Sequence, residues 1–480
     1  MNDLRFALFV QHECHTCVEL IPVFKRLRER LPDLKVYVQD NPACFASVRP
    51  LHDETLEVSF RHNIETTPTL IRWAGGKETG RTAGWVRQEW QSLTGIADLG
   101  CNLPAFLPGC GSKTRYPGAW ERLVATFGEP GLKSRQVQLD PWDDPMEACF
   151  ERGWSDGLPV VPPTDERILR MLSGADRKPD EIVGLVPPNL SECSVEKVAI
   201  NAVLAGCKPE YMPVVLAALE AALDPVFTMH GLLCTTYFSG PVIIVNGPIA
   251  RAIGMNWGIN ALGQGNRANA TIGRALQLII RNVGGGRPGE MDRATLGGPG
   301  KYTFCFAEDE TDPTWEPLSV SRGVAPGRSA VTLFQGDGIQ GVVDQKSRTP
   351  EELAKSLALA LTAANHPKLA QAADAILILS PEHYRIFRNA GWDRRRITQE
   401  LHAALVRPGR DLIAGAHGIG EGISPKRAEE MVPKFWEDGL LIVRAGGDAG
   451  LFSAICAGWT AGRVRGQTKP VTKEIKETRP

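Results

Sequence analysis

The chain has 480 residues, of which 43% are hydrophobic and 23% are charged, and its formal net charge is -1 at pH 7. This composition is typical of a globular chain of two to four domains. The balanced charge favours neither nucleic acid nor a membrane surface as a partner. Neither a signal-peptide pattern nor an apolar run of ~18 residues is present, so the expected location is the cytoplasm. There, the 11 cysteines are not expected to form a disulfide scaffold.

The first motif that carries chemistry is a Cys-x-x-Cys pair, Cys14 and Cys17. It follows an apolar run at residues 4–10, which predicts a buried strand, and it precedes a segment with helical spacing of apolar residues. A helix N-terminus stabilises a thiolate, and a thiolate is the species that attacks a disulfide. Half of a zinc site is the alternative, but no second ligand pair follows at zinc spacing.

The segments that follow this motif fit one compact module. They are a second strand at 34–39, a helix and connection at 44–60, a strand opening at Thr67-Pro68, a Gly75-Gly76 hairpin, a strand at 79–85 and a helix at 86–93. This order resembles the thioredoxin family over residues 4–96. The resemblance implies that Pro68 is cis and packs against Cys14 and Cys17, and that this pair forms a redox-active disulfide.

A segment rich in Gly and Pro follows at 98–145 and predicts a linker or a wrapping segment. It contains Cys101 and Cys110. They are either loop cysteines without a role or a second thiol pair that the module reduces or oxidises. We divide the chain into a redox domain (1–97), this segment (98–145), an α/β domain (146–465) and a flexible tail (466–480).

The large domain has buried strands predicted at 242–245, 375–379 and 440–444, which alternate with helical patterns. This alternation predicts an α/β domain with a mixed or parallel sheet covered on both faces. Ligands of such sheets bind beyond the carboxyl ends of strands. The loops there are Asn246-Gly247-Pro248, Pro381-Glu382-His383 and Gly446–Gly450. The last precedes an expected helix at 451–459, whose first N–H groups could hold an anion, although a tight turn is the alternative.

Polar residues in this domain supply the candidate site. The stretch 256–274 is rich in Asn and Gly and cannot add much to a core, which favours a substrate-binding loop. Arg267 and Arg274 would bind a substrate carboxylate, and His230 or His383 would act as general acid or base. Asn269 also suits a helix cap. The remaining substrate-binding candidates are Asn246, Asn260, Gly447 and Asp448.

Two further cysteines, Cys207 and Cys305, are interpreted first as buried residues. With Cys101 and Cys110 they are also the candidates for a redox partner of the Cys-x-x-Cys pair. An Ala-rich helix at 215–223 could form a homodimer contact.

The large domain contains several long motifs, which are WSDGLPVVPPT, SVEKVAINAVLAGCKPEYMPVV, NALGQGNRANATIGRAL, PGKYTFCFAEDE and GGDAGLFSAICAGW. Over residues 145–460 these motifs resemble the bacterial UGSC-type (seleno)protein family. The family label refers to a Cys/Sec-Gly-Ser-Cys motif, so the resemblance implies a redox-active Cys or Sec. The nearest match here is Cys110-Gly111-Ser112, followed by Lys113.

These observations predict a thiol-dependent oxidoreductase. The Cys-x-x-Cys module would exchange thiol and disulfide equivalents with a large domain that binds a small polar or anionic substrate. An external thiol would be the reductant, because no nicotinamide, flavin or haem motif is visible. One alternative is a lyase or hydrolase of carbon–sulfur or carbon–heteroatom bonds that the module keeps reduced. The other is a protein that handles soft metals through its cysteines.

Overall fold

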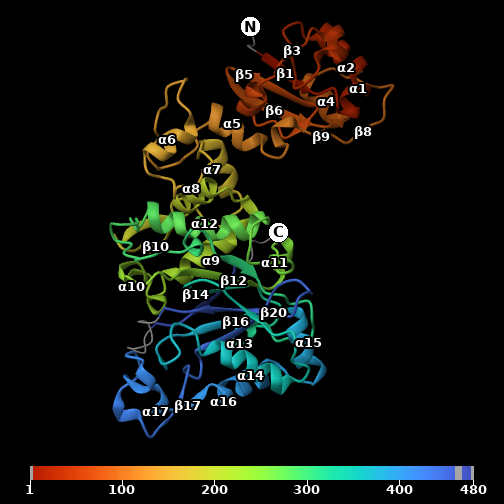
Figure 1. The fold of residues 1–480 in the computed structure, drawn as a ribbon. Helices are drawn as coiled ribbons and strands as arrows, with labels where there is room; N and C mark the ends of the chain where they lie inside the picture. The colour runs from red at the N-terminus through yellow and green to blue at the C-terminus, as the bar shows by residue number, and fades with distance from the viewer. Residues whose placement is uncertain (1–3, 460–467, 477–480) are drawn as a thin grey trace. The chain divides into compact units, whose positions relative to one another are not determined.

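The computed structural model describes residues 4–459 and 468–476 (Figure 1). The chain forms two compact units. Unit 1 comprises Met1–Gly131 and Asp165–Arg170, and unit 2 comprises Leu132–Thr164 and Met171–Pro480. Both contain helices and mixed sheets, so the predicted α/β class is confirmed.

Unit 1 is built on a five-stranded sheet in the order β3-β2-β1-β5-β6. The central strand β1 runs parallel to β2 and antiparallel to β5. One face is covered by α2 and α4, whose Phe24 and Trp90 pack against Leu8 of β1 in one buried cluster. The bounds are β1 (Leu4–Val10), α1 (His15–Glu19), α2 (Ile21–Arg30), β2 (Lys35–Val38), β3 (Leu51–His52), α3 (Glu57–Arg61), β5 (Thr69–Ala74), β6 (Lys77–Ala83) and α4 (Arg87–Thr94). The elements follow the predicted order.

Residues 98–131 belong to unit 1 and pair with its strands. β8 (Phe106–Leu107) is antiparallel to β7 (Trp85–Val86), and β9 (Cys110–Gly111) is antiparallel to β4 (Thr66–Thr67). The segment then enters α5 (Ala119–Phe127). Its first part therefore lies against the strand that precedes Pro68.

Unit 2 contains two four-stranded sheets, ordered β13-β12-β14-β21 and β15-β20-β16-β19. Ile244 and Phe334 of the first sheet share one buried cluster with Ile378 and Val443 of the second, so the two sheets face each other. The strands are β12 (Gly240–Asn246), β13 (Cys305–Ala307), β14 (Ala330–Gly336), β15 (Gln340–Val343), β16 (Ala375–Leu379), β19 (Leu440–Arg444), β20 (Phe452–Ala457) and β21 (Val471–Glu474).

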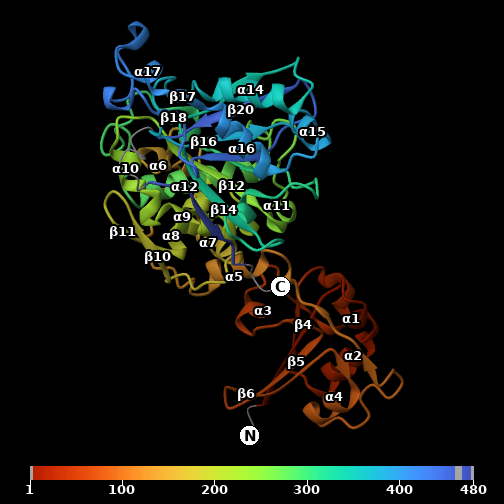
Figure 2. The same cartoon turned by 90° about the horizontal axis from the view of Figure 1, so that it is seen from below.

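Helices cover the outer faces of both sheets of unit 2 (Figures 1 and 2). α9 packs on β14 and β12, α12 packs on β13, and α8 packs on α12 and α9. α14, α15 and α16 pack on β16 through a second buried cluster. The bounds are α8 (Val195–Ala205), α9 (Met212–Ala222), α12 (Arg267–Asn282), α14 (Pro350–Leu361), α15 (Pro381–Asn389) and α16 (Arg394–Ala404). Within the described ranges no single helix is long and apolar enough to cross a membrane, and one bent pair, Pro209–Ala222 with Pro225–Cys234, reaches that length and composition together.

Three local predictions in unit 2 are wrong. Residues 452–457 form strand β20 instead of a helix, because they pair with both β15 and β16. Residues 471–474, predicted as part of a flexible tail, form edge strand β21 against β14, while 466–467 and 477–480 lie outside the described residues. The cap of α12 is Asn266, whose side chain accepts a hydrogen bond from the backbone N–H of Asn269, so Asn269 lies inside the helix.

Candidate functional site

The Cys14–Cys17 pair lies at the start of α1, as the sequence predicts. Cys14 is the N-cap residue, and its sulfur accepts a hydrogen bond of 3.3 Å from the backbone N–H of Cys17. As a thiol it donates to the carbonyl of Thr67, at 3.4 Å. The Thr67–Pro68 peptide is cis, which confirms that prediction. The strand around Pro68 thus approaches the pair.

The two sulfurs differ strongly in acidity. A hydrogen bond from the Cys17 thiol, helped by the Cys17 backbone N–H, lowers the pKa of Cys14 to about 5. Burial, and then the hydrogen bond and negative charge of Cys14, raise the pKa of Cys17 well above its ordinary value. Cys14 is therefore a thiolate at neutral pH beside a neutral thiol, which is the division of roles that disulfide exchange needs.

A third cysteine, Cys110, lies beside this pair. Pairing of β9 with β4 places Cys110 opposite Thr67, and the Cys110 side chain lies close enough to that of Cys14 to lower the pKa of Cys14. Cys101, from the same segment, is exposed. Of the four cysteines proposed as redox partners, the structure brings Cys110 alone to the pair within unit 1.

The other two proposed partners lie in unit 2 and are buried. Cys207 donates a hydrogen bond to the carbonyl of Thr271 at 3.4 Å, and burial raises its pKa to about 12. Burial also raises the pKa of Cys305 far above the ordinary value of a thiol. Both are neutral thiols at physiological pH, which agrees with their interpretation as core residues.

The two arginines predicted to hold an anion are bonded to protein groups instead. Arg274 forms a bidentate ion pair with Asp156, at 2.8 and 2.7 Å, and donates to the carbonyl of Leu158. Arg267 donates to the carbonyl of Gly206 at 2.9 Å. These contacts tie α12 to preceding segments.

The Asn-rich stretch is largely bonded to itself. Asn269 is buried, donates to the carbonyls of Asn256 and Ala261, and accepts from the backbone N–H of Asn256. Asn260 has a left-handed backbone (φ 59) and donates to the carbonyl of Gln264. The hydrogen bonds of these asparagines therefore hold the conformation of the loop itself.

The remaining substrate-binding candidates are spread over separate positions. Asn246 is fully buried and donates to the carboxylates of Glu308 and Glu310, both at 2.6 Å. Gly447 approaches Ile259 so closely that a Cβ atom would lie 2.8 Å from its side chain. Asp448 is exposed and forms an ion pair with Arg385. The structure does not gather them around one cavity.

The two histidines also lie apart. His383 is fully buried, and its ring nitrogens contact the Ser453 hydroxyl at 2.7 Å and the Asp344 carbonyl at 3.0 Å. Both nitrogens are therefore occupied by protein groups. His230 lies on the short helix α10 (Met229–Cys234) and is exposed.

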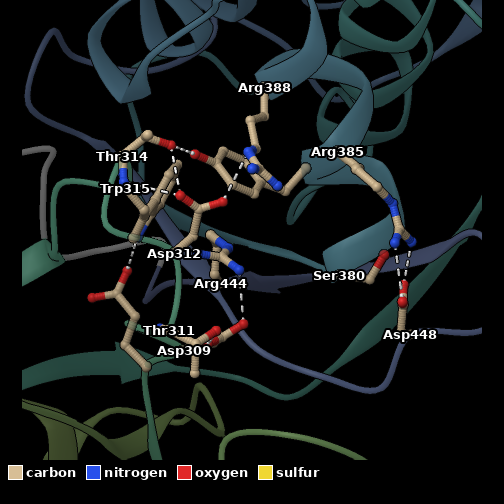
Figure 3. A network of polar contacts seen from close by, with 12 residues as sticks. Asp309, Thr311, Asp312, Thr314, Trp315, Ser380, Arg385, Arg388, Arg444 and Asp448 are labelled. Atoms are coloured by element: carbon tan, nitrogen blue, oxygen red, sulfur yellow. Dashed lines mark hydrogen bonds and ion pairs between the residues drawn. The ribbon is translucent and has the colours of Figure 1, made fainter.

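A polar cavity of about 300 Å³ opens at the carboxyl ends of β16 and β19 (Figure 3), as the sheet rule predicts. Its lining comes from the loop after β13, the start of α15 and the end of β19. The lining residues are Thr311, Asp312, Pro313, Pro381, Tyr384, Arg385, Arg388 and Arg444. Sequence reasoning named none of its three arginines.

Arg444 is the buried cation of this cavity. It is 4% exposed, and its Nη2 donates to Asp309 at 2.8 Å. Its guanidinium stacks over the Tyr384 ring, with 4.3 Å to the centroid. Among the residues that the structure describes, its Nε and Nη1 have no hydrogen-bond partner. A signal was present in the sequence, because an arginine ending an apolar strand (LLIVR) is unusual.

A carboxylate already lies within this group of arginines. Asp312 is 3.1 Å from the Nε of Arg388 and accepts two hydrogen bonds from Thr314. Although burial acts to raise it, the Thr314 hydrogen bonds and the charges of Arg388 and Arg444 hold the pKa of Asp312 below its ordinary value. The cavity therefore stabilises negative charge.

The comparisons add no family to these observations. No family model matches the chain, and no curated protein matches its sequence significantly. Within residues 4–459 and 468–476, no three His, Cys, Asp or Glu side chains are grouped as metal ligands.

Proposed function

We propose that the protein is a thiol–disulfide oxidoreductase whose unit 1 is a thioredoxin-fold module with Cys14 and Cys17 as its working pair. The observation that carries the proposal is the Cys14 sulfur at the N-cap of α1, where it accepts a hydrogen bond from the backbone N–H of Cys17. This position agrees with a lowered pKa of Cys14 and a raised pKa of Cys17. We place this activity in the cytoplasm, with an external thiol as the reductant.

The order of the two steps in disulfide reduction follows from the different pKa values of Cys14 and Cys17. The Cys14 thiolate attacks one sulfur of a disulfide, forming a mixed disulfide and releasing one thiolate. The negative charge of Cys14, which raises the pKa of Cys17, is then lost. Cys17 can deprotonate and attack the Cys14 sulfur, which releases the second thiol and leaves a Cys14–Cys17 disulfide. Two electrons pass from the pair to the substrate, and an external dithiol restores them.

A thiolate titration tests this proposal. The ultraviolet absorbance of thiolates, measured against pH as the difference between wild-type protein and Cys14→Ser, is expected to rise through a midpoint near pH 5, because Cys14 ionises there. Cys17→Ala removes the main hydrogen bond and should move the midpoint upward. Cys101→Ser, at an exposed cysteine of the same unit, should leave it in place. A midpoint near the ordinary thiol value of ~8.5 would refute the proposal.

We also propose that unit 2 binds a small anionic substrate, a carboxylate or a phosphate, in the cavity of Arg388 and Arg444. The observation in favour is the buried guanidinium of Arg444, which has two donors without a partner and belongs to a residue that lines the same cavity as Arg388 and Asp312. An added anion would displace the Asp312 carboxylate from Arg388, or it would bind beside Asp312 and accept from Arg444. Charge-assisted hydrogen bonds of this kind contribute ~1.5–3 kcal/mol each.

Inorganic phosphate and succinate are suitable probes of this cavity. Both are expected to raise the thermal unfolding temperature of the full chain. Arg388→Met should weaken the binding by about tenfold or more, and Asp312→Asn should strengthen it, because it removes the competing charge. The control is Arg396→Met, at an arginine of similar exposure on α16. If Arg396→Met weakens binding as much as Arg388→Met, the cavity is not the site.

A further inference from the structure

Residues 106–112, which we call the strap, cover the Cys14–Cys17 pair. The Thr16 hydroxyl donates to the carbonyl of Pro108 at 2.7 Å, and the Gln11 side chain donates to the carbonyl of Gly111 at 2.9 Å. The strap is thereby fixed on both sides of Cys110. Under it, Cys14 and Cys17 are both 0% exposed. A disulfide in solvent therefore has no direct access to the Cys14 sulfur.

Cys110 lies where an incoming disulfide would have to lie. Its side chain lies against that of Cys14 and against the backbone N–H groups of His15 and Thr16. β9 pairs with β4 in the way that an extended peptide adds to a strand. Unlike the two cysteines beneath it, Cys110 is partly exposed. It is thus the sulfur that touches both Cys14 and solvent.

We propose that Cys110 is a relay thiol that carries disulfide equivalents between external disulfides and the buried Cys14–Cys17 pair. This inference rests on the proposed function. In the first step, Cys110 passes its proton to the neighbouring Cys14 thiolate and attacks an external disulfide RSSR, forming Cys110–S–S–R. The released RS⁻ takes that proton from Cys14 and leaves as RSH, which restores the Cys14 thiolate. Cys14 then attacks the Cys110 sulfur, forming a Cys14–Cys110 disulfide and releasing the second RS⁻.

The last step returns the strap cysteine to its reduced form. Cys17 attacks Cys14, giving the Cys14–Cys17 disulfide and a Cys110 thiolate, which takes up the proton that Cys17 has lost. RSSR gains two electrons, and the pair loses two. Burial, and then the hydrogen bond and charge of Cys14, raise the pKa of Cys110 while Cys14 is a thiolate. In the Cys14–Cys110 disulfide that charge is absent, and the N–H groups of His15 and Thr16 face the departing sulfur.

A trapping experiment on the full chain tests the intermediate. Cys17→Ser removes the last step, so oxidised glutathione should convert this variant to a Cys14–Cys110 disulfide, identified by mass spectrometry as a cross-link between the two peptides. Cys17→Ser with Cys101→Ser should give the same cross-link. Finding Cys14 bound to glutathione while Cys110 remains a free thiol would overturn the relay.

A rate measurement separates the relay from the proposed function. Cys110→Ser should slow the reduction of insulin disulfides by about tenfold or more, because Cys14 then waits for the strap to open. Cys101→Ser should leave the rate unchanged. An equal or faster rate for Cys110→Ser would show that the strap only blocks access, and the relay would fail while the oxidoreductase stands. If the wild-type chain never forms a Cys14–Cys17 disulfide, the proposed function itself fails.

Discussion

Replacing Cys14 with serine is expected to lower the rate of disulfide reduction by about 10³-fold or more, to that of the external thiol alone. Serine keeps the size and the hydrogen bonds of the side chain but cannot ionise near pH 5, where the pKa of Cys14 lies. A hydroxyl is no nucleophile toward a disulfide sulfur under these conditions. The measurement is the dithiothreitol-dependent reduction of insulin by the full chain.

Two matched variants control this experiment. Cys101→Ser makes the same substitution at an exposed cysteine of unit 1, and Cys193→Ser makes it at a buried cysteine of unit 2, where burial raises the pKa to about 12. Both should retain wild-type activity. Substantial activity in Cys14→Ser, or an equal loss in Cys193→Ser, would show that another thiol carries the reaction.

Much of unit 1 could be predicted because its signals are local. The apolar run of β1, the Cys-x-x-Cys motif and the helical spacing after it are contiguous in the sequence, and β1 spans the predicted residues. The contact of Cys110 with Cys14 could not be predicted in the same way. It depends on the two-residue pairing of β9 with β4, which leaves no periodic pattern in a segment rich in Gly and Pro.

In unit 2 the sequence predicts where strands end, but not which side chains at those ends are free to bind a ligand. An apolar run such as 452–457 is compatible with a buried helix or a buried strand, and only the partners β15 and β16 decide between them. Arg274 is conspicuous in a polar stretch, yet Asp156, far away in the sequence, binds it. Arg444 ends the apolar strand β19, and nothing in its sequence neighbours indicates that it lines a cavity. Whether an arginine is paired or free depends on long-range contacts.

One buried carboxylate, Glu308, connects the segments that meet where β12 and β13 end in unit 2. Its side chain is 0% exposed and forms an ion pair with Arg394 at 2.8 Å. It also accepts hydrogen bonds from the Trp315 indole, the Leu318 backbone and the Asn246 amide. Glu308 therefore supplies the carboxylate that pairs with the Arg394 charge and an acceptor for each of these three donors. The adjacent Asp309 and Thr311 belong to the group that surrounds the anion cavity.

We expect Glu308→Ala to lower the free energy of unfolding of unit 2 by about 3–5 kcal/mol, because it leaves the Arg394 charge buried without its partner. Urea unfolding followed by tryptophan fluorescence measures the change. Glu400→Ala removes an exposed carboxylate that faces Arg396 and should cost less than ~1 kcal/mol. Replacing both partners, as Glu308→Leu with Arg394→Met, should cost less than Glu308→Ala alone, since no buried charge remains unpaired. If the single and double variants lose equal stability, the loss comes from packing and from the hydrogen bonds of Glu308. The ion pair would then contribute little to holding the strand ends in place.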